Sequence, residues 1–272
     1  MNVCVAGKNN IAINVCEYLL RHYPEIKLYA ITNRNDDGID GWQKSFFKYV
    51  NENTNIIHTE LECMYGLADL LFLSTEFDRI IDPKLFRTTR LFNIHFSLLP
   101  AYRGVYTSSL PILYGEQYSG VTLHCMDAGI DTGDIIAQER IRITKKETSY
   151  TLYLKYIDKG TNLITKNIEK LITGRFNAKP QLPEKASYYS RKSIDYSNLI
   201  INLKATASQI DKQIRAFYFP AFQVPIVYSY PIKYTKILQI RSTLRPGLVV
   251  RDSKDYIVVS TVDYDIKLYK QI

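Results

Sequence analysis

The sequence predicts an α/β fold, with a Rossmann-like, mostly parallel sheet followed by a small C-terminal domain rich in β-strands. Two observations support this class. Over residues 2–172, short apolar runs alternate with segments of helical periodicity, which is the pattern of a parallel sheet and its covering helices. After a proline-containing connection at residues 176–187, a single helix precedes several closely spaced short apolar runs that are typical of strands.

The N-terminal part is expected to alternate between strands and helices. Residues 2–7 form an apolar run that predicts a buried strand, and residues 11–21 predict a helix because Ile11, Val15 and Leu19 recur at helical spacing. The further expected elements are strands at 27–32, 70–74 and 91–96 and helices near 43–50 and 83–87. In such sheets, ligands bind at the carboxyl ends of the strands.

The second part of the sheet should consist of strands at 121–126 and 135–143. A long helix over 147–172, stopped by Gly174, is expected to follow. We therefore expect one domain over residues 1–180 and a smaller one over 181–272. The smaller domain is predicted to open with a helix at 207–217, followed by strands at 225–228, 237–240, 248–250, 256–262 and 266–269.

The composition describes a chain with an ample apolar core. Hydrophobic residues make up 46% of its 272 residues, yet no apolar run approaches the roughly 20 residues that span a bilayer. The apolar N-terminal stretch ends at Lys8, so no signal peptide is expected. The four cysteines include no Cys-x-x-Cys pair, so we expect neither a disulfide nor a metal site and predict a reducing, cytoplasmic location.

The net charge of +8 is distributed unevenly. Residues 1–140 carry 12 Lys and Arg against 17 Asp and Glu, whereas residues 141–272 carry 23 against 10. A basic C-terminal part is typical of proteins with an anionic partner, such as a nucleic acid, a membrane surface or a nucleotide diphosphate. A solvated basic face is the alternative. The positive charges are spread out, which disfavours nucleic acid as the partner.

A polar turn, Gly7-Lys8-Asn9-Asn10, follows the first expected strand. It lacks the Gly-x-Gly-x-x-Gly spacing of dinucleotide-binding folds and the P-loop pattern, so a dehydrogenase is disfavoured. Two interpretations stay open. Lys8 and Asn9 could bind an anion at the N-terminus of the next helix, or Asn9 or Asn10 could cap that helix.

Three polar residues indicate acyl-transfer chemistry. Asn93 and His95 lie two positions apart on an expected strand, so their side chains leave the same face. Asp131 lies in a tight turn after another strand. An amide that donates to an oxygen, an imidazole that takes a proton and a carboxylate that orients the ring together suit acyl transfer.

Three segments in this order carry a resemblance to a known family: Asn93-Ile94-His95, Ser97-Leu98-Leu99-Pro100-Ala101-Tyr102-Arg103-Gly104, and Asp127-Ala128-Gly129-Ile130-Asp131-Thr132-Gly133-Asp134. They resemble the signature of the folate-dependent formyltransferases. The resemblance implies an enzyme that transfers a formyl group from its co-substrate, N10-formyltetrahydrofolate, to an amine.

This chemistry assigns a role to each of the three residues. The Asn93 amide would stabilise the oxyanion, His95 would remove the proton with possible help to the oxyanion, and Asp131 would orient and charge-balance His95. The sequence leaves open which ring nitrogen carries the proton. The resemblance also implies a pterin pocket formed by the loops at 77–81 and 127–130, with expected contacts at Phe77, Arg79, Ile80, Asp127, Gly129 and Ile130.

The acceptor implied by the resemblance is a nucleotide-linked amino sugar, because residues 107–116 and 214–225 resemble segments of the sugar N-formyltransferases. We expect dTDP-4-amino-4,6-dideoxyglucose, with the 3-amino isomer close behind, in the synthesis of surface polysaccharide such as lipopolysaccharide O-antigen. The expected substrate contacts are Lys8, Asn9, Ser97, Leu98, Pro100, Arg103, Tyr106, Thr107, Arg191, Phe222 and Gln223.

The segment at 214–225 also suits a nucleotide base on physical grounds. Phe222 offers a stacking face, Gln223 can pair with a pyrimidine edge, and Arg215 can approach phosphate. Phe217 and Phe219 are expected to belong to the core of the small domain.

Two alternatives to the sugar enzyme are a methionyl-tRNA formyltransferase, favoured by the basic C-terminal part, and a folate- or sugar-nucleotide-binding module without catalysis. The presence of Asn93, His95 and Asp131 argues against the second. We expect neither a nucleic acid nor a membrane as partner. A small C-terminal β unit has exposed sheet edges, which predicts a homodimer.

Overall fold

The computed structural model describes residues 1–271, and within them the chain divides into two compact units. Unit 1 comprises residues 1–104, 120–141 and 155–188, and unit 2 comprises residues 105–119, 142–154 and 189–272. Each unit is thus assembled from separate segments, whereas the expected domains 1–180 and 181–272 are continuous in sequence. That boundary stays a prediction.

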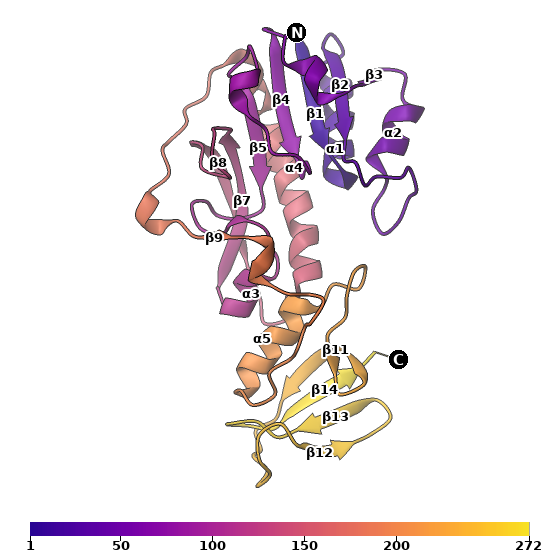
Figure 1. Ribbon diagram of the computed structural model, residues 1–272, viewed down its shortest axis with the longest axis vertical. Coiled ribbons are helices and arrows are strands. Elements are labelled where there is room, and N and C mark those ends of the chain that lie inside the picture. The colour runs from indigo at the N-terminus through magenta and orange to yellow at the C-terminus, as the bar shows by residue number, and fades with distance from the viewer. Residues whose placement is uncertain (272) are drawn as a thin grey trace. The chain divides into compact units, whose positions relative to one another are not determined.

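Unit 1 is built around a mostly parallel sheet with the strand order β3-β2-β1-β4-β5-β7-β8, as the α/β class predicted (Figure 1). Its strands are β1 (Asn2–Gly7), β2 (Lys27–Thr32), β3 (Ile56–His58), β4 (Leu70–Thr75), β5 (Leu91–His95), β7 (Tyr118–Cys125) and β8 (Ile135–Arg142). The strands from β3 to β5 pair in parallel, and β7 pairs with β5 in the antiparallel sense. The central strands β1 and β4 are apolar and buried because both of their faces are covered.

The helices of unit 1 are α1 (Asn9–His22), α2 (Phe46–Glu52), the C-terminal part of α4 (Ser149–Thr173), and the short 3₁₀ helices η1 (Leu61–Met64) and η2 (Pro83–Leu85). Gly160 of α4 lies beside Ile11 of α1 and Ile94 and Phe96 near the end of β5, so α1 and α4 cover one face of the sheet. The helix expected at 83–87 is only a single 3₁₀ turn, because Pro83 starts it and the chain extends again at Phe86.

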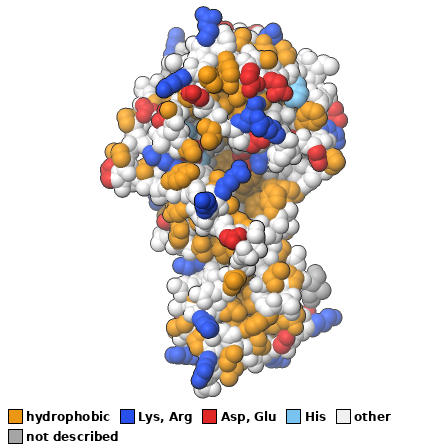
Figure 2. Space-filling model, viewed as in Figure 1, with side chains coloured by type: hydrophobic (Ala, Val, Ile, Leu, Met, Phe, Trp, Pro, Cys, Tyr) orange, Lys and Arg blue, Asp and Glu red, His pale blue; other side chains and the backbone are white. Residues whose placement is uncertain are grey.

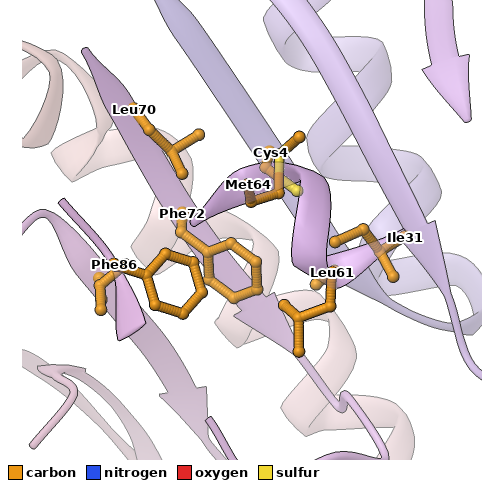
Figure 3. Close-up of a cluster of buried hydrophobic side chains, with 9 residues drawn as sticks. Cys4, Ile31, Leu61, Met64, Leu70, Phe72 and Phe86 are labelled. Atoms are coloured by element: carbon orange, nitrogen blue, oxygen red, sulfur yellow. The ribbon is translucent and has the colours of Figure 1, made fainter. Parts of the chain in front are cut away.

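A hydrophobic cluster covers the other face of this sheet (Figure 3). Cys4 of β1 and Leu70 and Phe72 of β4 point to this face, where Leu61 and Met64 of η1 pack on them. The buried residues of the cluster are Cys4, Ala6, Ile31, Leu61, Met64, Leu70, Phe72, Phe86 and Leu91. Because strand side chains alternate, Leu91 in this cluster places Asn93 and His95 on the same face of β5.

Unit 2 combines short helices with an antiparallel sheet. Its elements include α3 (Leu110–Tyr114), α5 (Ala207–Phe217) and a sheet with the order β10-β11-β14-β13-β12, coloured yellow in Figure 1. The strands are β10 (Ile226–Val227), β11 (Tyr230–Ile237), β12 (Val249–Asp252), β13 (Tyr256–Val259) and β14 (Ile266–Lys270). Helix α5 begins where the sequence predicted because Thr206 and Gln209 form a reciprocal capping box.

The strand predicted at 237–240 is wrong: β11 covers Tyr230–Ile237 instead. The prediction followed the apolar run, whereas the actual strand contains the exposed residues Lys233 and Lys236 and buries only Ile232. Short elements link the larger ones: β6 (Arg103–Gly104), β9 (Tyr188–Tyr189), η3 (Pro183–Lys185) and η4 (Arg191–Ser193).

Two further observations concern residues 1–271 as a whole. None of the helices in this range has the length and apolar composition required to cross a membrane. Nor does the described part of the chain contain a group of three or more His, Cys, Asp or Glu side chains placed to hold a metal ion.

Candidate active site

The carboxyl end of β5 positions the two polar side chains that the sequence singled out. Asn93 is half-buried, and the His95 side chain is 9% exposed. Asp131 reaches them from the turn between β7 and β8, where it has a left-handed backbone conformation with φ of 56°. Residues far apart in sequence therefore meet at one edge of the unit 1 sheet.

The Asp131 carboxylate is the centre of this cluster. Its Oδ1 lies 3.4 Å from Nδ1 of His95 and 3.4 Å from Nδ2 of Asn93, and its Oδ2 accepts a 2.9 Å hydrogen bond from the Gly104 N–H. These contacts hold the carboxylate between the two β5 residues. The convergence on which the acyl-transfer interpretation depends is present.

The pKa of Asp131 follows from these contacts. Burial by itself would raise the pKa of this carboxyl, but the His95 imidazole and the hydrogen bond from the Gly104 N–H oppose burial, and the pKa is lowered to about 2. Asp131 is therefore ionised at neutral pH and supplies a fixed negative charge beside the His95 ring.

The His95 ring is held at both nitrogens. Nε2 lies 2.7 Å from the carbonyl oxygen of Tyr102, and because a carbonyl only accepts, Nε2 carries a hydrogen in this contact. Burial lowers the pKa of His95 below its ordinary value, and the nearby Asp131 and Tyr102 oppose this effect. Burial thus favours the neutral His95 ring, whereas Asp131 and the Tyr102 carbonyl stabilise the protonated ring.

A second histidine, His124, also belongs to the cluster, although the sequence analysis did not identify it. Its Nε2 lies 3.0 Å from Nδ2 of Asn93 and 3.7 Å from Oδ1 of Asp131. The available signal was its position in the strand predicted at 121–126, one residue before the end of β7. Only the antiparallel pairing with β5, which places His124 directly opposite Asn93, reveals the contact.

A glutamine from the connection, Gln181, supports the turn that carries the carboxylate. Its Nε2 donates to the carbonyl oxygens of Asp131 at 2.9 Å and Gly133 at 2.7 Å. Its Oε1 accepts from Nε and Nη2 of Arg103 at 3.1 and 2.7 Å. No sequence pattern points to Gln181, since it lies 50 residues beyond Asp131.

Comparisons with known proteins agree with this geometry. Residues 58–168 match the formyl transferase family. An N-formyltransferase from Helicobacter canadensis, solved with folinic acid and dTDP-3-aminofucose, is 39% identical, with 99% of each chain covered and a TM-score of 0.90. The chain belongs to the sugar N-formyltransferase family. WlaRD, a sugar 3N-formyl transferase solved with dTDP and 5-N-formyl-THF, is also 39% identical to the present chain, with 99% of this chain and 97% of WlaRD covered and a TM-score of 0.91.

Curated relatives of the present chain include methionyl-tRNA formyltransferases. The enzyme of Enterococcus faecalis is 31% identical over 199 residues, which cover 72% of the present chain and 63% of the relative. The chain thus spans a little under two thirds of the length of these tRNA enzymes.

The loops expected to contact folate lie beside the hydrophobic cluster of unit 1. Phe77, from the first loop, and Met126, which immediately precedes the second, both pack against that cluster. The guanidinium of Arg79 lies 5.0 Å from the centre of the Phe77 ring, and its Nε is buried without a hydrogen-bond partner within residues 1–271. Ile80 is 81% exposed. This side of the cluster therefore combines exposed apolar surface with an unused donor.

The second expected folate loop is organised by its own carboxylate. Oδ1 of Asp127 accepts from the Gly129 N–H at 3.1 Å and from the Thr132 hydroxyl at 2.5 Å. Gly129 has no room for a side chain, because a Cβ there would lie 2.0 Å from Oγ1 of Thr132. Ile130 is 43% exposed. Asp127 thus shapes the loop, which leaves backbone groups and Ile130 as the surface for a ligand.

The loop after β5 is held by hydrogen bonds from side chains to its own backbone. The Ser97 hydroxyl is buried and donates to the Ala101 carbonyl at 2.7 Å, and Thr122 and Gln138 bind the backbone of the same loop. Leu98 and Pro100 are half-buried. Ser97 therefore holds the loop in shape, and the contacts of this loop with a substrate stay a prediction.

The structure of the turn after β1 bears on one of its two interpretations, the capping of the next helix. Helix α1 begins at Asn9 with Lys8 as its N-cap and no side-chain capping hydrogen bond, so the expectation that Asn9 or Asn10 caps the helix is wrong. Asn10 instead accepts from the Lys44 N–H at 3.0 Å and so anchors the loop before α2. Anion binding by Lys8 and Asn9 remains a prediction.

The other expected substrate residues lie in unit 2. The Tyr106 hydroxyl donates to the Arg191 carbonyl at 3.1 Å, and Thr107 follows Tyr106 before α3. Phe222 is 70% exposed, with its ring centre 5.0 Å from that of buried Phe219, and Gln223 is half-buried beside it. Phe222 therefore presents an exposed aromatic face.

The core assignment of Phe217 and Phe219 is confirmed, since each is 6% exposed. Arg215, which was expected to approach phosphate, makes its contacts with other residues of unit 2. Its Nε lies 2.8 Å from Asp211, and its Nη1 donates to the Glu147 carbonyl at 3.0 Å.

Proposed function

We propose that this protein transfers the formyl group of N10-formyltetrahydrofolate to the amino group of a dTDP-linked amino-dideoxyhexose. The observation that carries the proposal is the meeting of Asn93, His95 and Asp131 at one carboxylate oxygen. Family membership adds weight, because two full-length relatives at 39% identity were solved with formyl folates and dTDP or a dTDP-sugar.

The cluster supports each step of the transfer. The amine nitrogen attacks the formyl carbon, and the negative charge that develops on the formyl oxygen is met by an N–H of Asn93. The amine proton passes to His95, where the Asp131 carboxylate 3.4 Å from Nδ1 stabilises the charged ring. The bond from the formyl carbon to N10 then breaks, and tetrahydrofolate leaves with a proton on N10.

The folate site proposed for this reaction lies between the loops at 77–81 and 127–130. Phe77, Ile80 and Ile130 supply apolar surface for a flat ring, and Nε of Arg79 is a buried donor without a hydrogen-bond partner within residues 1–271. Backbone groups of Asp127 and Gly129 supply the polar contacts, since the Asp127 carboxylate is used within its own loop.

The acceptor proposed is the 3-amino isomer of the sugar nucleotide, in place of the 4-amino isomer that the sequence ranked first. Of the two relatives at 39% identity, one was solved with dTDP-3-aminofucose and the other is a sugar 3N-formyl transferase, whereas a 4-N formyltransferase from Francisella tularensis is only 20% identical. Phe222 and Gln223 would contact the base, while Arg191, Tyr106 and Thr107 would contact the remainder of the nucleotide sugar. Lys8, Asn9, Ser97, Leu98, Pro100 and Arg103 complete the proposed substrate contacts.

The test is a direct assay of formyl transfer. The protein is mixed with N10-formyltetrahydrofolate and, in separate reactions, with the 3-amino sugar nucleotide, the 4-amino isomer or methionyl-tRNA, and tetrahydrofolate release is followed by absorbance. Faster release with the 3-amino sugar supports the proposal, and release with methionyl-tRNA alone would replace it. The tRNA reaction is included because the curated relatives and the basic C-terminal part favour it as the second candidate. A tRNA enzyme would also show a steep dependence on salt.

The assembly proposed is a homodimer formed through the edge strand of unit 2. β12 lies at the end of its sheet and is exposed at every residue, with Val249 and Val250 41% and 39% exposed. An open apolar edge of this kind pairs readily with a second copy. Size-exclusion chromatography with light scattering should give about twice the mass of one 31.5 kDa chain, and a monomer at micromolar concentration would contradict the dimer.

The cellular setting proposed is the cytoplasm, where surface-polysaccharide precursors such as those of lipopolysaccharide O-antigen would be formylated. The four unpaired cysteines fit a reducing compartment.

A further inference from the structure

We propose that His124 is a positioning residue that fixes the orientation of the Asn93 amide, so that one N–H of Asn93 faces the reacting formyl oxygen. The inference rests on the proposed function of Asn93 and adds a residue to which neither the sequence motifs nor the comparisons assign a role. It follows from the place of His124 in the sheet, its hydrogen bonds and its burial.

The sheet register brings the two side chains together. β5 and β7 are antiparallel, and Asn93 and His124 are direct partners across this pair, as are His95 and Thr122. Side chains of directly opposed residues on one face lie close enough to touch. His124 is 2% exposed, so its ring contacts are made within the protein.

The hydrogen bonds of the His124 ring select one tautomer. Nδ1 lies 2.7 Å from the carbonyl oxygen of Cys125, which only accepts, so Nδ1 carries the hydrogen. In the neutral ring, Nε2 then has a free lone pair, and it lies 3.0 Å from Nδ2 of Asn93. His124 therefore accepts a hydrogen bond from the Asn93 amide.

This acceptor sets the direction of the amide. With one N–H of Asn93 committed to His124, the other N–H points toward Oδ1 of Asp131 at the longer distance of 3.4 Å. That weaker contact leaves the second N–H ready to be taken over by the formyl oxygen. Rotating the amide by 180° would set its oxygen against the His124 lone pair and the Asp131 carboxylate, which is unfavourable.

The carbonyl that selects the tautomer is itself held in a tight position. A Cβ at Gly133 would lie 1.9 Å from the oxygen of Cys125, so the turn passes this carbonyl where only glycine fits. The N–H of Cys125 also donates to the Asp134 carbonyl at 2.9 Å. The turn that carries Asp131 therefore also fixes the carbonyl that orients His124.

The first test is a direct reading of the tautomer and needs no activity. In uniformly ¹⁵N-labelled protein, long-range ¹H–¹⁵N spectra at neutral pH should show His124 with hydrogen on Nδ1 and a bare Nε2. The side-chain amide signals of Asn93 should shift in His124→Leu. A hydrogen on Nε2 of neutral His124 would overturn the inference, because the ring would then donate to Asp131 instead of accepting from Asn93.

The second test measures catalysis in a double-mutant cycle. Since loss of one oxyanion donor typically costs about 10²–10³ in rate, we expect His124→Leu to lower kcat by about 10²-fold. The KM values for both substrates should change by less than about threefold, because KM reports binding that the ground state shares with the transition state. His124→Gln, whose side-chain oxygen can accept from Asn93, should recover part of the rate, and should carry this test if His124→Leu does not fold.

In an Asn93→Ala background, the His124 substitution should lower kcat by less than about threefold, because its partner is already absent. The full 10²-fold loss in that background, or an unchanged kcat in His124→Leu, would overturn the inference. His22→Leu, the same change at an exposed histidine of α1, is the matched control and should keep the wild-type rate. If the wild-type protein transfers no formyl group to any acceptor, the proposed function fails, while the tautomer measurement still decides the hydrogen-bond arrangement.

Discussion

The polar cluster of unit 1 and the aromatic surface of unit 2 place functional side chains in opposite environments. In unit 1, the side chains of His95, His124 and Asp131 are at most 12% exposed, and each polar atom that carries the chemistry has a partner. In unit 2, Phe222 is 70% exposed, and Figure 2 shows apolar and basic side chains together on the surface of the β11–β14 region. Buried groups tune protonation, whereas exposed rings provide contact area, so substitutions in the two regions should change different kinetic constants.

The largest effect should come from His95→Asn. The variant keeps a polar side chain of similar shape, so the fold and nucleotide binding should persist, but it has no proton acceptor near neutral pKa. General-base catalysis contributes about 10²–10⁴-fold, and we expect a loss of kcat of at least about 10³-fold. Steady-state assays together with calorimetric titration of dTDP would check this. A rate near that of the wild type would remove His95 as the base.

Asp131→Asn should have the next largest effect, about 10²-fold or more in kcat, because the amide removes the charge that stabilises protonated His95. Its pH profile gives a second readout. Asp131 raises the pKa of His95, so its removal should move the acid limb of kcat/KM to lower pH. An acid limb that moves to higher pH would contradict the assigned coupling between these two groups.

Phe222→Ala tests the other side of the comparison. Stacking on an aromatic side chain is worth about 1–3 kcal/mol per base, which corresponds to roughly tenfold or more in affinity. We expect KM for the dTDP-sugar to rise by about tenfold while kcat changes by less than about threefold. Tyr264→Ala, which removes another exposed ring of unit 2, is the control and should leave both constants unchanged. A loss confined to kcat in Phe222→Ala would assign the ring to unit 2 structure instead of base contact.

The smallest expected effect is the pH dependence of the wild-type protein's activity. Burial lowers the pKa of His95, so the base stays neutral to lower pH than an exposed histidine would. Activity should therefore fall with an apparent pKa below about 6.5 as the solution is acidified, and Asp131, with its pKa of about 2, should stay ionised throughout. A kcat/KM profile from pH 5 to 8 measures this. An acid limb centred above 6.5 would show that the proton acceptor is another group.

Much of the fold was predictable because local signals were unambiguous. The continuous apolar runs of β1 and β2 and the capping box of α5 gave the bounds that the structure has. The strand β11 was misplaced because its charged, solvent-facing residues dilute the apolar signal. Periodicity detects one face of an element, and it detects that face poorly when the element is short and half-exposed.

Within the candidate site, Asn93, His95 and Asp131 were singled out by their side-chain types and by the resemblance to the formyltransferase signature, but the residues that contact them were not. His124 acts through an antiparallel pairing between β5 and β7, and hydrophobic periodicity does not reveal the direction of pairing. Gln181 binds the carbonyl of Asp131, which lies 50 residues away in the sequence. A glutamine in a polar connection has no local sequence signature that would predict such a contact. Chemistry that depends on side-chain type is visible in a sequence, whereas contacts made only by tertiary structure are not.

The bridge made by Gln181 has a practical consequence for anyone who shortens this protein. A fragment that stops at residue 180 would keep Asn93, His95 and Asp131 yet lose the amide that ties the carboxylate's turn to Arg103, together with the Ser187 hydroxyl that accepts from the Tyr102 N–H at 2.8 Å. The stretch after α4 therefore supports the turn that carries Asp131, and we expect any active fragment to extend at least through Ser187.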